Sequence, residues 1–91
     1  MISVTMIDVD TYRVDIEGSL ATTAEVRMTN ECYLMLSGGR FTHEWTIVQV
    51  CRELISADTF DWTQSKFSID ALTETHPNVI RNAKALLLDS S

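Results

Sequence analysis

Apolar and polar side chains alternate along the first part of the chain, which is the period expected of β-strands. Three segments show this alternation, at residues 2–6, 12–16 and 24–28. Asp8–Thr11 separates the first two segments, and Gly18-Ser19 follows the second, so we expect turns there. Ile7 and Val9 break the alternation of the first segment. This break indicates either a β-bulge or a strand with apolar side chains on both faces.

The alternation continues on both sides of Gly38-Gly39, after a predicted turn at Asn30-Glu31. Glycine tolerates the positive φ that a two-residue hairpin turn requires. Such a turn would place three pairs of side chains opposite one another on one face of the sheet: Leu36 with Phe41, Leu34 with His43, and Cys32 with Trp45. We therefore predict strands at residues 32–37 and 40–45. The whole sheet would be mainly antiparallel, with four or five strands over about residues 2–45.

A helical spacing begins after these strands. The apolar stripe of this predicted helix consists of Ile47, Val50, Cys51, Leu54 and Ile55. Thr46 is a suitable N-cap, and Gln49 stands where a capping box needs it, so we predict an amphipathic helix over residues 47–57. It would cover the sheet face that bears Leu34, Leu36 and Phe41.

The last third of the chain contains a connector and a second helix. Residues 58–67 are aromatic and acidic and show neither period, whereas residues 65–75 fit a short strand and a helical turn equally well. Pro77 suits the first turn of a helix, where its missing N–H group has no partner to lose. The apolar stripe that follows consists of Val79, Ile80, Ala83, Leu86 and Leu87. We predict a helix over residues 77–88, and Leu88 lies off its stripe.

Composition is that of one folded α+β domain. The chain has 91 residues, of which 45% are hydrophobic and 22% charged, enough for a single core without disulfides. The chain starts without the basic and apolar segments of a secretory signal, so we expect a cytoplasmic protein with reduced Cys32 and Cys51. No apolar run approaches the roughly 18 residues of a membrane span.

No catalytic, metal-binding or nucleotide-binding motif is present. Cys32 and Cys51 lie on predicted core faces, where thiols behave as small hydrophobic groups. Together with His43 and His76 they could supply four zinc ligands, but no characteristic spacing groups them. Basic residues occur singly, which disfavours direct binding of nucleic acid. We therefore predict a protein that is not an enzyme and has neither cofactor nor metal.

Charge provides the first functional indication. Thirteen acidic residues against seven basic ones give a net charge of −6, and the acidic residues concentrate in the first third of the chain. That third contains Asp8, Asp10, Asp15, Glu17, Glu25 and Glu31. Such a balance favours a protein partner with a basic surface. We predict Asp8, Asp10, Asp15 and Glu17 as partner-binding residues.

The aromatic connector is a second candidate surface. Phe60, Trp62 and Phe67 stand close together around Asp61, and exposed aromatic side chains are common anchors of protein interfaces. The competing interpretation is that these rings cover the core beneath a loop. We add Phe60, Asp61 and Trp62 to the predicted partner-binding residues.

These observations favour a small acidic protein-binding protein, an adaptor or inhibitor that occludes the surface of a partner. One alternative is an inhibitor whose carboxylates imitate a nucleic-acid backbone and block a basic groove. Another is a small enzyme or ligand-binding module that uses His43 with Glu44 or Cys32. A homodimer through the sheet or through Leu88 is a further alternative.

Overall fold

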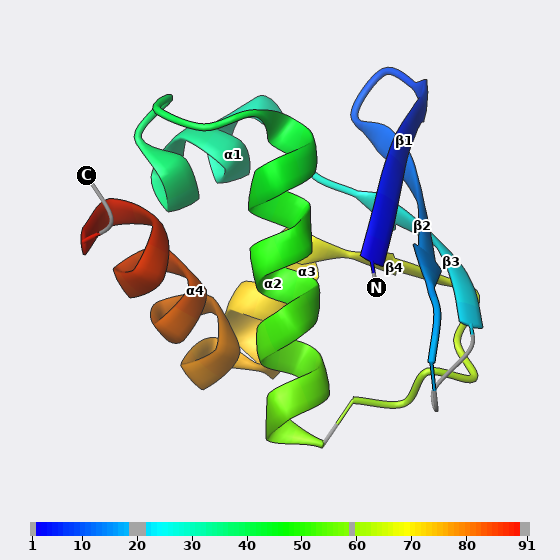
Figure 1. Cartoon of the computed structure of the whole chain (residues 1–91). Coiled ribbons are helices and arrows are strands. Elements are labelled where there is room, and N and C mark those ends of the chain that lie inside the picture. Colours follow the sequence, from blue (N-terminus) through cyan, green and yellow to red (C-terminus); the bar gives the residue numbers. More distant parts are fainter. Residues whose placement is uncertain (1, 19–21, 59, 90–91) are drawn as a thin grey trace.

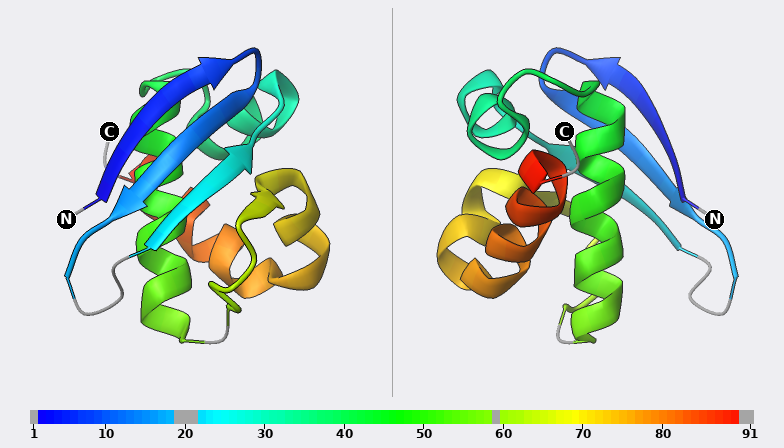
Figure 2. Two further views of the ribbon diagram at one scale, coloured as in Figure 1. Left: turned by 90° about the vertical axis from the view of Figure 1, so that its right-hand side faces the viewer. Right: turned by 60° about the vertical axis from the view of Figure 1, so that its left-hand side comes forward.

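The structure is a computed structural model that describes residues 2–18, 22–58 and 60–89. It confirms the α+β class, with four strands and four helices in this part of the chain. The elements are β1 (Ile2–Asp8), β2 (Thr11–Ile16), β3 (Thr22–Arg27), α1 (Asn30–Ser37), α2 (His43–Ala57), β4 (Lys66–Ser68), α3 (Ile69–Thr75) and α4 (Pro77–Asp89). Helices cover one face of the sheet and leave the other open (Figures 1 and 2). Ser19 and Thr59, from the predicted turn and connector, lie outside the described residues.

The sheet has the strand order β1-β2-β3-β4. The first three strands pair antiparallel, and β4 pairs parallel with β3. A register shift between Met6 and Asp8 confirms the bulge that Ile7 indicated. The helix-side row of β2 consists of Tyr12, Val14 and Ile16, which are at most 5% exposed. The opposite row of the same strand is polar, so the alternation predicted for these strands corresponds to one buried and one wet face.

The predicted strands at residues 32–37 and 40–45 are wrong. Residues 30–37 form α1, whose N-cap Thr29 accepts a hydrogen bond from the backbone N–H of Cys32 at 3.3 Å. Gly38 ends this helix in the left-handed conformation at φ 64°, and its N–H donates to the carbonyl of Leu34. The positive φ of the glycine therefore terminates a helix, whereas we expected it in a hairpin turn. Leu34 is 48% exposed, so it is not part of the predicted core face.

The helix predicted from residue 47 begins one turn earlier. Thr42, and not Thr46, is the N-cap of α2, since its Oγ1 accepts from the N–H of Trp45 at 3.0 Å. Thr46 is fully buried within the helix, where its hydroxyl donates to the carbonyl of Thr42. The added turn places His43 in the helix, so it does not lie opposite Leu34 in a sheet.

Helix α2 carries the centre of the core. Four members of its predicted stripe, Ile47, Val50, Cys51 and Leu54, are fully buried. The fifth, Ile55, is 38% exposed. The helix packs against α4, α1 and β1. In the right-hand view of Figure 2 it stands between the sheet and the other helices.

Residues 65–75, for which strand and helix remained open, contain both. Lys66–Ser68 is β4 and Ile69–Thr75 is α3. Asp70, in the first turn of α3, accepts hydrogen bonds from the N–H of Thr29 at 3.1 Å and from its hydroxyl at 2.5 Å. The residue that caps α1 is thus also the residue that joins it to α3.

The C-terminal helix α4 extends from Pro77 to Asp89, one residue beyond the prediction. Val79, Ile80, Ala83 and Leu87 are buried as expected, whereas Leu86 is 48% exposed and Leu88 is half-buried. Among the helices of the described residues, none combines the length and apolar character needed to cross a membrane.

Truncating the α2 stripe should destabilise the fold. Leu54→Ala removes a fully buried side chain, so we expect the free energy of unfolding to fall by about 3 kcal/mol. The neighbouring Ile55→Ala, at a position 38% exposed, is the matched control and should lower it by less than about 1 kcal/mol. Urea unfolding followed by circular dichroism measures both values. Equal losses would contradict the assignment of the core.

Candidate protein-binding surface

The turn between β1 and β2 holds two of the predicted partner-binding residues, Asp8 and Asp10. The backbone N–H of Val9 donates to the carboxylate of Asp8 at 2.7 Å, and the hydroxyl of Thr11 donates to the carbonyl of Val9 at 3.2 Å. Asp10 adopts a left-handed conformation at φ 56°, which aspartate tolerates better than most residues. Its carbonyl accepts from the N–H of Met28 at 3.0 Å. The turn is therefore held both internally and by the end of β3.

We use the name β1–β2 turn for residues 7–11, which include the last two residues of β1 and the first of β2. Two apolar side chains are exposed there. Val9 is 77% exposed and Ile7 is 49% exposed. Ile7 is the additional residue of the bulge, which explains why it broke the alternation. The sequence signal for these residues was that break in parity, but parity alone could not show whether they were buried.

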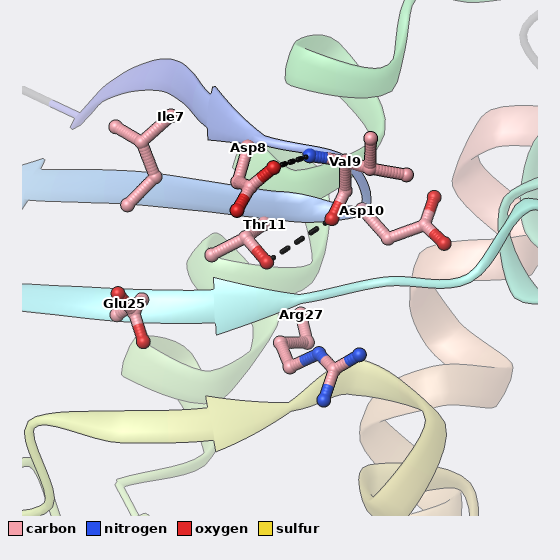
Figure 3. A pocket seen from close by; sticks show the side chains of 7 residues that line it. All are labelled: Ile7, Asp8, Val9, Asp10, Thr11, Glu25 and Arg27. Atoms are coloured by element: carbon pink, nitrogen blue, oxygen red, sulfur yellow. Dashed lines mark hydrogen bonds between the residues drawn. The ribbon is translucent and has the colours of Figure 1, made fainter.

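An open hollow of about 610 Å³ lies beside the turn on the uncovered side of the sheet (Figure 3). It is lined by Ile7, Asp8, Val9, Asp10, Thr11, Glu25 and Arg27. Figure 3 shows the carboxylate of Asp10 pointing away from that of Asp8, so they are not arranged to share one ligand atom. The hollow combines carboxylates and the guanidinium of Arg27 with apolar side chains, so it could contact both polar and apolar groups of a protein.

The charges around the hollow are unequally neutralised. Glu25 forms an ion pair with Lys66 on the adjacent strand at 3.6 Å. Within the described ranges, no ion pair involves Asp8 or Asp10. Within these ranges the carboxylates of the turn therefore have no cationic side chain paired with them.

Asp15 and Glu17 lie away from this turn. Asp15 is on the open face of β2, where it pairs with Arg13 at 3.3 Å and accepts from the hydroxyl of Thr23 at 2.8 Å. Glu17 follows β2 and lines a second hollow, of about 500 Å³, together with Asp15 and residues of β1 and β3. In Figure 1 the β1–β2 turn and the last residues of β2 lie at opposite ends of the sheet. The predicted acidic residues thus occupy two ends of the sheet and do not form one row.

The open face itself carries both signs of charge. Arg13, Glu25 and Lys66 occupy neighbouring positions in the register across β2, β3 and β4. Two ion pairs join residues of this face, Arg13 with Asp15 and Lys66 with Glu25. Such a mixed face does not favour the alternative in which carboxylates imitate a nucleic-acid backbone.

The connector places its rings against the core. Phe60 contacts Trp62 and Phe67 edge to face, with ring centroids 4.9 and 4.7 Å apart. All three rings are half-buried and pack on the core cluster. This arrangement favours the interpretation in which they cover the core beneath a loop.

Asp61, between those rings in the sequence, is fully exposed to water. Its carboxylate accepts from the hydroxyl of Thr63 at 2.5 Å and from the backbone N–H of Thr63 at 3.0 Å. These two hydrogen bonds favour the charged form and lower the pKa of Asp61. Its charge lies on the connector, apart from the carboxylates of the β1–β2 turn.

His43 packs between aromatic rings near the same end of the sheet as the turn. Its ring stacks on that of Tyr33, with centroids 3.7 Å apart, and lies parallel to that of Tyr12 at 6.4 Å. The Tyr33 hydroxyl donates a hydrogen bond to the carbonyl of Phe41. The pKa of Tyr12 is raised, first by burial and then by the negative charge of Glu44. Neither described hollow is lined by His43. The stack gives His43 a packing role, and the enzyme or ligand-binding alternative stays a prediction.

Both cysteines are buried and free, as predicted. Burial raises the pKa of the Cys51 thiol to about 12. Burial, followed by the charge of Asp70, raises the pKa of the Cys32 thiol to about 11. A nucleophilic cysteine needs a lowered pKa. Among the described residues, no group of three or more His, Cys, Asp or Glu side chains is placed to hold a metal ion.

Alkaline pH should destabilise the fold through Cys51. The unfolded chain releases this proton near the ordinary pKa of 9.0, whereas the folded chain holds it to about 12, so the contribution is complete below pH 9 and lost as the pH rises toward 12. We expect Cys51→Ala to make the decline of unfolding free energy shallower by up to about 1.4 kcal/mol per pH unit in this window. Urea unfolding at a series of pH values measures the slope. Identical slopes would contradict the shift.

The chain matches no protein-family model, no curated protein and no solved structure. The geometry of the β1–β2 turn and the hollow beside it is therefore the basis for a functional proposal.

Proposed function

We propose that this chain is a small protein-binding protein, an adaptor or inhibitor, that occludes a basic surface of its partner with the β1–β2 turn. The observation that carries the proposal is the pairing, on one turn, of exposed Ile7 and Val9 with two carboxylates that have no ion pair within the described ranges. Exposed apolar side chains supply area to bury in a complex. Neighbouring carboxylates supply attraction to lysine and arginine side chains.

The backbone of the turn supports this role. Asp10 is joined to Met28, and Val9 is held on both sides by the side chains of Asp8 and Thr11. A surface that is already ordered loses little conformational entropy when it docks. The turn also projects beyond the helical layer in Figure 1, so a partner could approach it without displacing a helix.

The proposal rests on the turn alone among the predicted partner-binding residues. Asp15 is engaged by Arg13 and Thr23, and the rings of Phe60 and Trp62 are half-buried against the core. We place the protein in the cytoplasm, where free thiols such as those of Cys32 and Cys51 persist.

Removing the two turn carboxylates should weaken partner binding. The double variant Asp8→Asn/Asp10→Asn keeps side chains that accept hydrogen bonds and tolerate the left-handed conformation, but it removes both charges. We expect the dissociation constant of a partner captured from cell extract at low salt to rise about tenfold. Calorimetry with the isolated partner measures this change.

The matched control is Asp58→Asn/Glu74→Gln, which removes the same charge from two exposed positions outside the turn. It should leave affinity within about twofold of the parent chain. Raising the salt from 50 to 300 mM should weaken binding of the parent more than binding of the turn variant, because screening acts on the exposed charges. Loss of affinity in the control as large as in the turn variant would refute the proposal.

A further inference from the structure

The two edges of the sheet differ in their protection. β4 is a three-residue strand that begins with Lys66 and leads directly into α3. Short length, a lysine and an adjoining helix are the features that prevent an edge from pairing with another chain. β1 is seven residues long and has no proline and no charged residue before Asp8. The β1 edge is therefore the one that remains available for a further strand.

The core is also less completely covered at β1. Ile2, Val4 and Met6 pair with Ile16, Val14 and Tyr12 and so share the helix-side face of the sheet. Their partners on β2 are at most 5% exposed. Ile2 and Val4 are only half-buried, and Met6 is 58% exposed.

Helix α2 lies against β1 on the helix side of the sheet. Within the described residues, the outer edge of β1 has no partner strand. An additional strand beside β1 would cover part of the exposed surface of Val4 and Met6.

We propose that the occupant of the β1 edge is the β1 edge of a second copy of this chain, paired antiparallel about a two-fold axis at Val4. In this register Val4 lies opposite the Val4 of the other copy, and Ile2 lies opposite Met6. Ser3 lies opposite Thr5 on the open face. Every apolar side chain thus meets an apolar one and every hydroxyl meets a hydroxyl, and both are favourable cross-strand pairs. The two sheets become one.

Charge favours a second copy over a basic partner at this edge. The paired segment, residues 2–6, contains no carboxylate that could attract lysine or arginine side chains. It also contains no charge that would oppose its own copy. The net charge of −6 still repels two chains at a distance, so screening by salt should strengthen the dimer. The effect of salt on the dimer is therefore opposite to its effect on binding of a basic partner at the β1–β2 turn. The two contacts also use different residues, because Ile7–Asp10 lies outside the paired segment.

Sedimentation equilibrium tests the association. The chain should form a dimer at concentrations of about 100 µM, and its dissociation constant should fall as salt rises from 50 to 300 mM. A monomer at every concentration and salt would overturn the proposal. A dimer that weakens with salt would overturn it as well, because ionic contacts would then hold the copies together.

Cross-linking tests the register. Directly opposite residues in an antiparallel pair approach closely enough for a disulfide, whereas positions two residues apart along the ladder are about 7–8 Å apart. Val4→Cys should therefore form an intermolecular disulfide under mild oxidation. The matched control Ser3→Cys, in the same strand but opposite Thr5 of the other copy, should form at least tenfold less. Equal cross-linking of the two variants would refute the register.

Charge substitution tests the same contact in a different way. Ser3→Lys/Thr5→Lys places lysines opposite one another twice, so we expect the dissociation constant to rise about tenfold. Ser3→Lys/Thr5→Glu places opposite charges at the same positions, so the dimer should persist. Circular dichroism establishes that each variant is folded. A dimer unaffected by the double lysine variant would show that the contact lies elsewhere and would overturn the proposal.

Discussion

The burial of one apolar stripe of α2 is the constraint on which the other elements of the structure depend. Ile47, Val50 and Leu54 are fully buried, and each contributes about 1.5–3 kcal/mol through removal from water. The stripe is enclosed by the sheet on one side and by α4 on the other (Figure 2). Because the helices of the described residues lie on that side of the sheet, they leave its other face and the β1–β2 turn uncovered. The surface from which we infer binding is thus the surface that the core does not use.

The sequence predicted the fold class and most elements, but not the segment from Cys32 to Trp45. Five successive residues there, 32–36, are apolar or aromatic, so a two-residue period and a helical one fit equally well. The side chains that decide the outcome are Thr29 and Thr42, which cap α1 and α2. The Gly38-Gly39 pair suggested a hairpin turn, so the helix that Thr29 caps was not predicted. Thr46 was an equally plausible N-cap for α2, so Thr42 was not chosen.

The position of the candidate site could be predicted from the sequence, but the contacts between its charged side chains could not. A polar turn at Asp8–Thr11 and an irregularity at Ile7 followed from local pattern, and the structure contains both. The pairing of Asp15 with Arg13 and the distance between the two acidic ends of the sheet depend on strand register and direction, which no local pattern contains. The same holds for the ring stack of His43, because it joins α1, α2 and β2.

The bond between Thr29 and Asp70 has a consequence for how the chain folds. It joins groups 41 positions apart, and the parallel pairing of β3 with β4 spans a similar distance. Closing so long a loop loses entropy before any contact compensates for it, whereas the β1–β2–β3 meander closes short loops only. We therefore expect the meander to assemble before β4 and α3 join it. Because β4 has only three residues, we expect its paired backbone groups to exchange hydrogen with solvent faster than those of the meander.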